Sequence, residues 1–334
     1  MVELAPLHTF ALNYKAARLF EFVRTTDVVK AAKSVGLFAK THYLLGGGSN
    51  TLFCQDFNGS IIRYTDDSIN ITEDQDYYYL KIGAGYNWHK LVEHTVTKGI
   101  YGLENLALIP GLVGAAPIQN IGAYGMEFGK YVDYVEYLDK STLKLEKLKG
   151  DECNWGYRDS IFKGELAGKV LITTVGLKLA KKWQANNSYA GLQGLTDAKQ
   201  IFTAVIDIRN SKLPNPIDLP NAGSFFKNPI ISKPHFTQLK KQFADMPSFS
   251  AKGNNVKVPA AWLIDYCGLK GFSIGGVGVY AKHGLVLVNH SGGSGDDLLA
   301  LVKRMREQVK LSFAIDLEIE VRLVGASGLL EAGG

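Results

Sequence analysis

Two short stretches of the sequence place reactive side chains in surroundings that suit catalysis. In residues 155–160, Arg158 stands among aromatic residues and a glycine, an arrangement that suits fork-like recognition of a carboxylate. In residues 221–229, Ser224 follows a flexible Ala-Gly pair and precedes two phenylalanines, which would carry its hydroxyl into a dry site. A surface ion pair and a turn hydroxyl are the ordinary alternatives, and these patterns alone leave both open.

A third stretch lies near the C-terminus, where apolar and polar residues alternate strictly over residues 317–323. This period of two predicts a strand with its apolar side chains in the core, so that the other face carries Glu318, Glu320 and Arg322. A charged face that pairs with a neighbouring strand is the alternative. No G-x-S-x-G motif surrounds Ser224, so the motif does not predict a triad nucleophile.

Two glycine-rich segments are predicted to bind a ligand. A short predicted strand runs into residues 46–50, Gly-Gly-Gly-Ser-Asn, where backbone N–H groups can approach an anion because glycine has no Cβ. An ordinary tight turn explains this segment equally well. Residues 110–125 contain four glycines, three alanines and two prolines, so their backbone can lie against a planar ligand or a pyrophosphate. We expect this long segment to lack regular structure, which usually indicates a functional loop.

Other motifs for nucleotides and metals are missing or weak. No GxxxxGK[ST] sequence occurs, and the loose G-x-G-x-x-A match at residues 276–281 precedes a strand instead of opening a helix, so a Rossmann domain is not expected. His89 and His94 are five residues apart and miss a common helix face, and we predict no metal site. The three cysteines form no CxxC pair, which fits a reducing cytoplasm.

Composition limits the class of protein. A chain of 334 residues suggests about two domains, and 46% hydrophobic with 21% charged residues excludes a disordered chain. The net charge of +5 is dispersed, so no nucleic-acid partner is expected, although a small anionic ligand would suit it. The sequence shows neither a secretion signal nor an apolar run long enough for a membrane span.

Hydrophobic periodicity and capping residues predict the elements of three blocks. Helices are expected at residues 26–35, 87–98, 196–211, 233–243, 259–267 and 296–309. Strands are expected at residues 43–45, 60–64, 77–82, 131–138, 142–148, 170–179, 285–289 and 317–323. A Pro-Asn-Pro break at residues 214–216 marks a boundary, and residues 325–334 are expected to form a frayed tail.

Taken together, residues 47–50, 109–125, 156–160, 221–229 and 318–322 resemble the UDP-N-acetylenolpyruvoylglucosamine reductase family of bacterial peptidoglycan synthesis. These five motifs occur in the right order over nearly the whole chain, and the region around Ser188 and Tyr189 looks like the longer form, in which a tyrosine loop closes over the substrate. The resemblance implies an α+β protein with a vanillyl-alcohol-oxidase (PCMH) type FAD-binding fold and an α+β substrate-binding domain. The implied FAD-binding subdomains are residues 1–65 and residues 66–213, the latter completed by residues 315–325, with residues 214–314 as the substrate domain.

The resemblance also implies the chemistry. NADPH reduces a non-covalently bound FAD, and the enolpyruvyl ether of UDP-N-acetylglucosamine then takes a hydride from flavin N5 at its β-carbon. Ser224 donates a proton to the α-carbon, while Arg158 and Glu320 stabilise the enolic intermediate. The implied substrate contacts are Tyr157, Tyr189, Lys212, Asn228 and His283, of which His283 departs from the glutamine expected there.

The implied flavin contacts are Gly46, Gly47, Gly48, Ser49, Asn50, Ile109, Pro110, Gly111, Gly114, Ala115, Ala116, Gln119, Asn120, Gly122, Ala123, Tyr124, Gly125, Arg209 and Arg322. The expected partner is a small molecule only, for a monomeric cytoplasmic enzyme that contacts neither nucleic acid nor membrane.

Two alternatives remain. An oxygen-using flavin oxidase of the same fold would be favoured by a flavin-linked histidine and by the absence of the Ser-Phe-Phe-Lys-Asn-Pro run, which this chain has at residues 224–229. A non-catalytic nucleotide-binding protein should lack at least one of Arg158, Ser224 and Glu320, and all three are present.

Overall fold

The structure, a computed structural model, describes residues 1–290 and 292–330. Contacts between Cα atoms divide the chain into two compact units. The terminal unit consists of residues 1–16, residues 48–58 and the chain from residue 212 onward, and the central unit consists of residues 17–47 and 59–211. Each unit has its own hydrophobic core.

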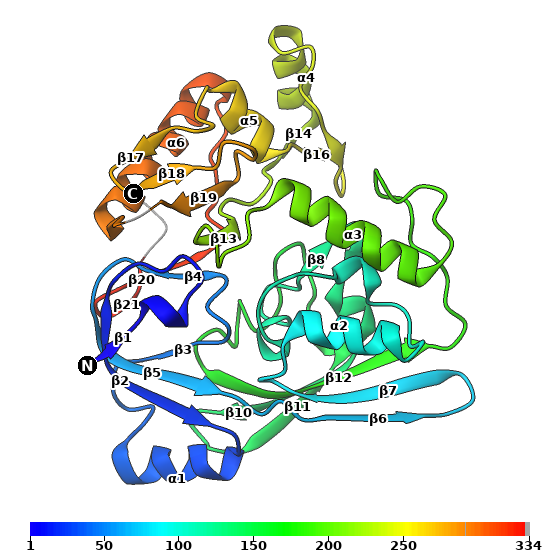
Figure 1. Cartoon of the computed structure of the whole chain (residues 1–334), viewed down its shortest axis with the longest axis vertical. Coiled ribbons are helices and arrows are strands. Elements are labelled where there is room, and N and C mark those ends of the chain that lie inside the picture. Colours follow the sequence, from blue (N-terminus) through cyan, green and yellow to red (C-terminus); the bar gives the residue numbers. More distant parts are fainter. Residues whose placement is uncertain (291, 331–334) are drawn as a thin grey trace. The chain divides into compact units, whose positions relative to one another are not determined.

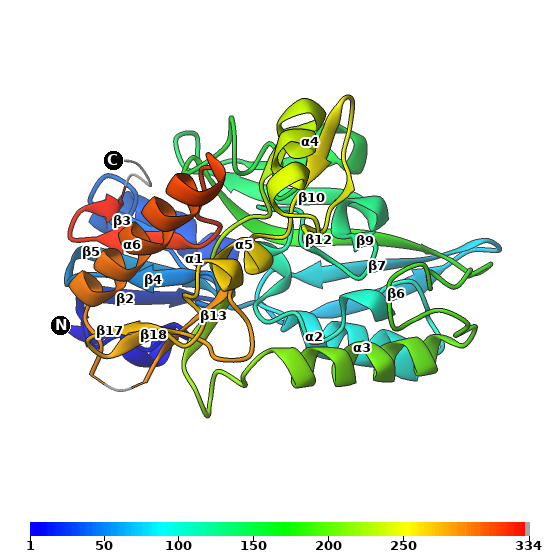
Figure 2. The ribbon, with the colours of Figure 1, turned by 90° about the horizontal axis from the view of Figure 1, so that it is seen from above.

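The central unit is built on a five-stranded antiparallel sheet (Figures 1 and 2). Its order is β11 (Leu145–Lys149), β10 (Val132–Asp139), β12 (Val170–Ala180), β7 (Tyr77–Gly83) and β6 (Ile69–Glu73). The middle strand, β12, is buried from Val170 to Leu177. A strand covered on both faces reads as a continuous apolar run, which is why the sequence predicts it well.

Helices α2 (Trp88–Thr97) and α3 (Ala198–Lys212) lie on one side of this sheet (Figures 1 and 2). The side chain of Asn87 caps α2 by accepting the Lys90 N–H, and Trp88, Leu91 and Val92 are buried on its inner face. Between α2 and β10 the chain forms short elements that carry much of the candidate site. They are η2 (Glu104–Leu106), η3 (Val113–Ala115), β8 (Gly122–Ala123), β9 (Met126–Glu127) and η4 (Phe128–Tyr131).

The remaining N-terminal elements include a four-stranded sheet of order β1-β2-β5-β3. Its strands are β1 (Val2–Glu3), β2 (Lys15–Phe22), β5 (Phe57–Tyr64) and β3 (His42–Leu44). The other elements are η1 (Ala5–Leu7), α1 (Thr25–Val35) and, after β11, η5 (Gly150–Glu152). Gly36, with a φ of 63°, ends α1 in the left-handed conformation that favours glycine.

The terminal unit contains an antiparallel sheet of order β13 (Asn221–Ser224), β19 (Val286–Asn289), β18 (Val277–Val279) and β17 (Ser273–Ile274). Its core includes α5 (Ala260–Tyr266) and α6 (Gly295–Phe313). Ser294 caps α6 in a reciprocal pair with Asp297, and Leu298, Leu301 and Val302 recur at the spacing of one buried helical face.

Two smaller sheets complete the terminal unit. One has the order β14 (Ile230–Ser232), β16 (Asn255–Lys257) and β15 (Phe249–Ser250), and α4 (Lys233–Gln242) follows β14 directly. The other has the order β21 (Gly328–Leu329), β20 (Arg322–Gly325) and β4 (Thr51–Phe53), in which β20 runs parallel to β4. Strand β20 therefore pairs with β4, the segment that directly follows residues 46–50.

Three predictions from the sequence need correction. The strand expected at residues 317–323 begins at Arg322. Residues 317–321 alternate in burial only in part, since Ile319 and Glu320 are both half-buried, and they form no ladder apart from a bridge between Ile319 and Phe226. The expected frayed tail pairs through β21, although residues 331–334 lie outside the described residues. Residues 109–125 are not irregular throughout, since they include η3 and β8.

The strand predicted at residues 142–148 starts later, at Leu145, because Asp139 accepts the N–H groups of Ser141 and Thr142 in a turn. All six predicted helices are present with ends that differ by a few residues. Within residues 1–290 and 292–330, no helix combines the length and the apolar character that crossing a bilayer requires.

Candidate active site

Arg158 lies at the tip of a tight turn in the central unit. Gly156 and Asp159 exchange backbone hydrogen bonds across the turn, with N···O distances of 3.0 and 3.3 Å. Arg158 has a φ of 54°, a conformation that costs free energy for a residue with a Cβ and is found where surrounding contacts enforce it. Its Nη2 donates to the Gly122 carbonyl at 2.9 Å, and its guanidinium lies 5.5 Å from the centre of the half-buried Tyr157 ring.

Side chains tie this turn to the glycine-rich segment 109–125. The Ser160 hydroxyl donates to the Ile118 carbonyl at 2.9 Å. The buried amide of Asn120 donates to the Gly156 carbonyl at 3.0 Å and accepts the Gly129 N–H at 2.8 Å. These bonds fix the Arg158 turn on the segment that is predicted to contact the flavin.

The two glycine-rich segments meet within the central unit. A Cβ on Gly47 would lie 3.0 Å from the Gly111 Cα, and one on Gly46 would lie 3.5 Å from the Ala115 Cβ. An added Cβ at Gly47 would thus be crowded against the Gly111 backbone. Two other glycines are needed for packing alone, because a Cβ on Gly114 would meet Ala84 at 2.5 Å and one on Gly122 would meet the Met126 carbonyl oxygen at 2.8 Å.

The remaining predicted flavin contacts of this segment lie with it in the central unit. Ala116 is buried, whereas Gln119 and Ala123 are half-buried. Ile109 is half-buried against the core, and Pro110 is exposed.

Two aromatic rings and an arginine form a cluster at the end of that segment. The rings of Tyr124 and Tyr189 lie 4.9 Å apart in an edge-to-face arrangement at 76°. Arg209, on α3, makes a side-chain hydrogen bond to the Tyr124 hydroxyl. Burial raises the pKa of Tyr124 and lowers the pKa of Arg209, while the attraction between the two groups opposes both shifts.

The Arg209 Nε is buried and has no hydrogen-bond partner among the described residues. The positive charge of Arg158 also contributes to the lowered pKa of Arg209. Two neighbouring guanidinium groups favour an anion between or beside them, such as a carboxylate or a diphosphate.

In the terminal unit, backbone hydrogen bonds bring the Ser224 and Glu320 stretches together. The Glu320 N–H donates to the Phe225 carbonyl at 2.8 Å, and the Lys227 N–H donates to the Glu318 carbonyl at 2.9 Å. Ser224 itself is exposed, contrary to the dry site that the sequence predicts, because the phenylalanines after it fill the core instead. Of the predicted catalytic trio, Arg158 belongs to the central unit and the other two residues belong to the terminal unit.

Residues 320–322, at the start of β20, also meet the end of residues 46–50 inside the terminal unit. The Asn50 amide donates to the Glu320 carbonyl at 3.4 Å, and the Arg322 N–H donates to the Asn50 carbonyl at 2.9 Å. Gly48 has a φ of 67°, and a Cβ there would lie 2.0 Å from the Leu7 carbonyl oxygen, so only glycine fits. Ser49, between them, is half-buried.

Three predicted substrate contacts lie elsewhere in the terminal unit. Lys212 is exposed at the end of α3, and His283 is half-buried in the turn before β19. Burial lowers the pKa of His283, and the charges of Lys212 and Lys270 lower it further. The Asn228 Oδ1 accepts the Ala260 N–H at 2.9 Å at the start of α5, so its amide nitrogen is the atom that a ligand would meet.

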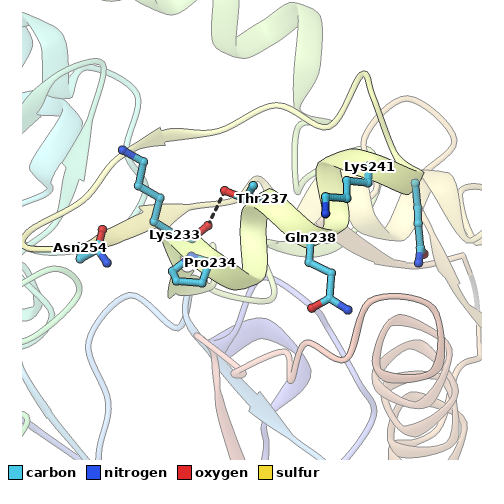
Figure 3. Close-up of a pocket in the computed structure, with 7 residues that line it drawn as sticks. Lys233, Pro234, Thr237, Gln238, Lys241 and Asn254 are labelled. Carbon is cyan, nitrogen blue, oxygen red and sulfur yellow. Dashed lines mark hydrogen bonds between the residues drawn. The ribbon is translucent and has the colours of Figure 1, made fainter.

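An open surface hollow of about 780 Å³ runs along α4 and is lined by residues of that helix and by Asn254 (Figure 3). Lys233, Thr237, Gln238 and Lys241 point from the helix, and Asn254 lies beside its first turn. No predicted site residue lines this hollow. Within the described residues, no group of three or more His, Cys, Asp or Glu side chains is arranged to hold a metal ion.

Two buried polar residues that support the central-unit site, Glu104 and Asn105, were not predicted from the sequence. The available signal was a Glu-Asn pair inside the apolar run from Ile100 to Ile109, since such residues are seldom fully buried unless they are hydrogen-bonded.

Comparisons with known proteins cover almost the whole chain. Residues 215–324 match the C-terminal domain of UDP-N-acetylenolpyruvoylglucosamine reductase, and residues 16–142 match an FAD binding domain. Proteins named UDP-N-acetylenolpyruvoylglucosamine reductase are 48% identical in Pectobacterium atrosepticum, covering 99% of this chain and 97% of that protein, and 44% identical in Shewanella sp. strain ANA-3, covering 97% and 96%.

The crystal structure of UDP-N-acetylenolpyruvylglucosamine reductase from Thermus caldophilus is similar, with a TM-score of 0.70 and 23% identity. The match covers 96% of this chain and 97% of the Thermus caldophilus chain. The protein therefore has the expected α+β architecture, with a vanillyl-alcohol-oxidase type FAD-binding fold and a C-terminal α+β domain.

Proposed function

Because the chain belongs to the UDP-N-acetylenolpyruvoylglucosamine reductase family, we propose that it uses NADPH and FAD to reduce the enolpyruvyl ether of UDP-N-acetylglucosamine to UDP-N-acetylmuramate. The observation that carries this proposal is similarity of 44–48% identity over nearly the full length of two proteins with that name. The protein is a flavin oxidoreductase of peptidoglycan synthesis, and NADPH and the roles of individual residues are the proposed part.

The residues of the glycine-rich segments fit FAD. Bare backbone at Gly47 and Gly111 comes into direct contact, which leaves little side-chain bulk where a planar ring system or a diphosphate would lie. The buried Arg209 Nε has no partner among the described residues and supplies a cation for a flavin oxygen or a phosphate. We propose residues 1–65 and 66–213, completed by residues 315–325, as the flavin-binding subdomains, and residues 214–314 as the substrate-binding domain.

The balance of the reaction defines what the protein must supply. FAD held along residues 46–50 and 109–125 would supply the hydride, which originates from NADPH, for the β-carbon of the enolpyruvyl group. The β-carbon thereby becomes a methyl group, and negative charge develops at the α-carbon and its carboxylate. One proton from the protein then completes the α-carbon, so that the sum consumes one NADPH and one proton.

Ser224 is the proposed proton donor. Its hydroxyl gives its proton to the α-carbon and regains one from solvent after the reaction. A free serine hydroxyl is a weak acid, so the transfer requires a short distance to a carbanion-like centre, and a positioned donor contributes about 10²–10⁴-fold to the rate. The backbone bonds that hold the Ser224 and Glu320 stretches side by side support this role, because they fix the serine without using its hydroxyl.

Arg158 and Glu320 are proposed to act on the substrate carboxylate. The Arg158 guanidinium is already oriented by its bond to the Gly122 carbonyl, so little reorganisation free energy is needed when charge develops on the carboxylate. Tyr157, Tyr189, Lys212, Asn228 and His283 are the proposed contacts for the rest of the UDP-sugar. We propose a monomeric enzyme whose partner is this small molecule.

Reduction and reoxidation of the flavin test the proposal. The purified protein should be yellow, and it should release FAD when it is denatured. NADPH should bleach the flavin absorbance, and the UDP-enolpyruvyl sugar should restore it without oxygen. Reoxidation that requires oxygen and ignores the sugar would instead identify an oxidase, and a colourless protein that binds no FAD would contradict the proposal altogether.

A further inference from the structure

Glu104 and Asn105 form a fully buried polar pair in η2, with exposed fractions of 0%. Burial of a carboxyl and an amide costs free energy unless their atoms are hydrogen-bonded. Both Glu104 oxygens and the Asn105 amide nitrogen have partners, whereas the Asn105 Oδ1 has none among the described residues. The partners therefore show what this burial achieves. They lie on segment 109–125 and on the tyrosine loop, defined here as residues 181–197, which precedes α3.

Glu104 holds the beginning of the tyrosine loop. Its Oε2 accepts the Gly102 N–H at 2.6 Å, and its Oε1 accepts the indole N–H of Trp183 at 2.7 Å. The Trp183 ring also packs edge-to-face on Tyr101 at 5.5 Å. The first turn of the loop is thus fastened to a buried carboxyl group.

Asn105 joins the tyrosine loop to segment 109–125. Its Nδ2 donates to the Tyr124 carbonyl at 2.9 Å and to the Asn186 carbonyl at 2.8 Å. Asn186 in turn donates from its side chain to the Gly125 carbonyl at 3.0 Å. Tyr124 has a φ of 50°, so its carbonyl points in a direction that a regular backbone would not give, and the buried amide stabilises it there.

The consequence is seen at Tyr189. Its ring lies 4.9 Å from the ring of Tyr124, whose hydroxyl is hydrogen-bonded to Arg209. The Asn105 amide bonds to the carbonyls of both Tyr124 and Asn186, so it ties together the two backbone segments that carry these rings. Glu104 and Asn105 are not themselves reacting groups, and any effect they have on the reaction is transmitted through the loop.

We propose that Glu104 and Asn105 are positioning residues that hold the tyrosine loop on segment 109–125 and thereby set the affinity for the UDP-sugar through Tyr189. This inference rests on the proposed function only for the identity of the ligand. The attachment of the loop can be measured without any substrate.

Hydrogen–deuterium exchange tests the attachment. Asn105→Asp keeps the shape of the side chain but removes both donated hydrogens, and we expect exchange to quicken by at least about tenfold both in residues 183–197 and at Tyr124 and Gly125. Asn187→Ala is the matched control, because Asn187 bonds to the Leu195 carbonyl inside the loop at 2.8 Å, and should leave exchange at Tyr124 and Gly125 unchanged.

Trp183→Phe, which removes the donor to Glu104 but retains a ring, is the second variant in case Asn105→Asp folds poorly. Exchange that stays at the wild-type rate in both variants would overturn the proposal.

Steady-state kinetics test the link to the substrate. For Asn105→Asp we expect KM for the UDP-enolpyruvyl sugar to rise at least about tenfold, while flavin reduction at saturating NADPH changes by less than about threefold. In a Tyr189→Ala background the same substitution should change KM by less than about twofold, since the residue through which it acts is gone.

Additive effects would indicate a purely structural role and would contradict the proposal. A wild-type enzyme that does not reduce the sugar would contradict the proposed function instead, and leave the exchange result to decide on the loop.

Discussion

In the central unit, the turn that carries Arg158 is held mainly by bonds from side chains. In the terminal unit, the stretches that carry Ser224 and Glu320 are held side by side mainly by bonds between backbones, together with an ion pair between Lys227 and Glu318. Asn120, Ser160 and Arg158 itself each donate to a carbonyl on the opposite segment. In the terminal unit, the Glu320 N–H and the Phe225 carbonyl make the corresponding contact.

Because of this difference, a substitution in the terminal unit can affect function alone, whereas one in the central unit also affects stability. Where backbones form the contact, a side chain can be replaced without moving its neighbours, so Ser224 is free to carry chemistry alone. Where side chains form the contact, removing one also leaves a buried carbonyl or N–H without its partner. Substitutions in the central unit should therefore affect both stability and function.

Ser224→Ala is expected to give the largest functional effect with almost no structural one. Reoxidation of the reduced flavin by the UDP-sugar should slow by about 10²–10⁴-fold, while the rate of flavin reduction by NADPH stays nearly constant. Stopped-flow absorbance of the flavin separates the two steps, and Ser250→Ala, at an exposed strand position, is the control. Equal loss in both steps would show that the serine does not act as a proton donor.

Gly48→Ala tests the backbone fit of the terminal unit. The added Cβ would lie 2.0 Å from the Leu7 carbonyl oxygen, so we expect the free energy of unfolding to fall by at least about 4 kcal/mol. Gly223→Ala is the matched control, because Gly223 has a similar φ of 69° but no atom within 4 Å of the added Cβ. Its cost should be about 1 kcal/mol in urea unfolding. Equal costs would mean that φ alone, and not close approach, requires glycine at residue 48.

Asn120→Ala tests the side-chain bonds of the central unit. The substitution leaves the Gly129 N–H without its partner and removes the shorter of two hydrogen bonds to the Gly156 carbonyl, so we expect a loss of about 3 kcal/mol in the free energy of unfolding. Weaker retention of FAD during dialysis should accompany this loss. A variant with wild-type stability would show that the Arg158 turn does not depend on Asn120, and the contrast between the units would fail.

Protonation of His8 is expected to give the smallest effect on stability. It is an exception within the terminal unit, because here the charge of a side chain changes the free energy of unfolding. Burial lowers the pKa of His8 to about 4, against 6.5 for a free histidine. The unfolded chain therefore binds a proton first, and stability is lost as the pH falls from about 6.5 to about 4. We expect this loss to be about 2–3 kcal/mol and to be absent in His8→Leu. An identical pH dependence of urea unfolding in the variant would refute it.

Local signals in the sequence were enough to predict all six helices. Asn87 and the apolar residues after it define α2, and Gly36 ends α1, because caps and helical periodicity depend only on residues a few positions apart. Strand β12 was equally clear as an apolar run. The strand at residues 317–323 was predicted too early, since alternation reports burial, whereas a strand also needs a partner backbone along its whole length.

The chemistry-bearing residues Arg158, Ser224 and Glu320 were chosen from sequence motifs and family resemblance, and their roles remain proposals. The sequence by itself determined the family and the helices, whereas the structure showed at which glycines an added Cβ would collide with distant backbone. Tertiary structure decided which donors meet which carbonyls, such as the Asn105 amide between Tyr124 and Asn186. The physical reason is that hydrogen bonding is chemically general: any buried amide can bond to any carbonyl, so a pairing across 81 residues is selected by the packing of the whole unit and leaves no local pattern.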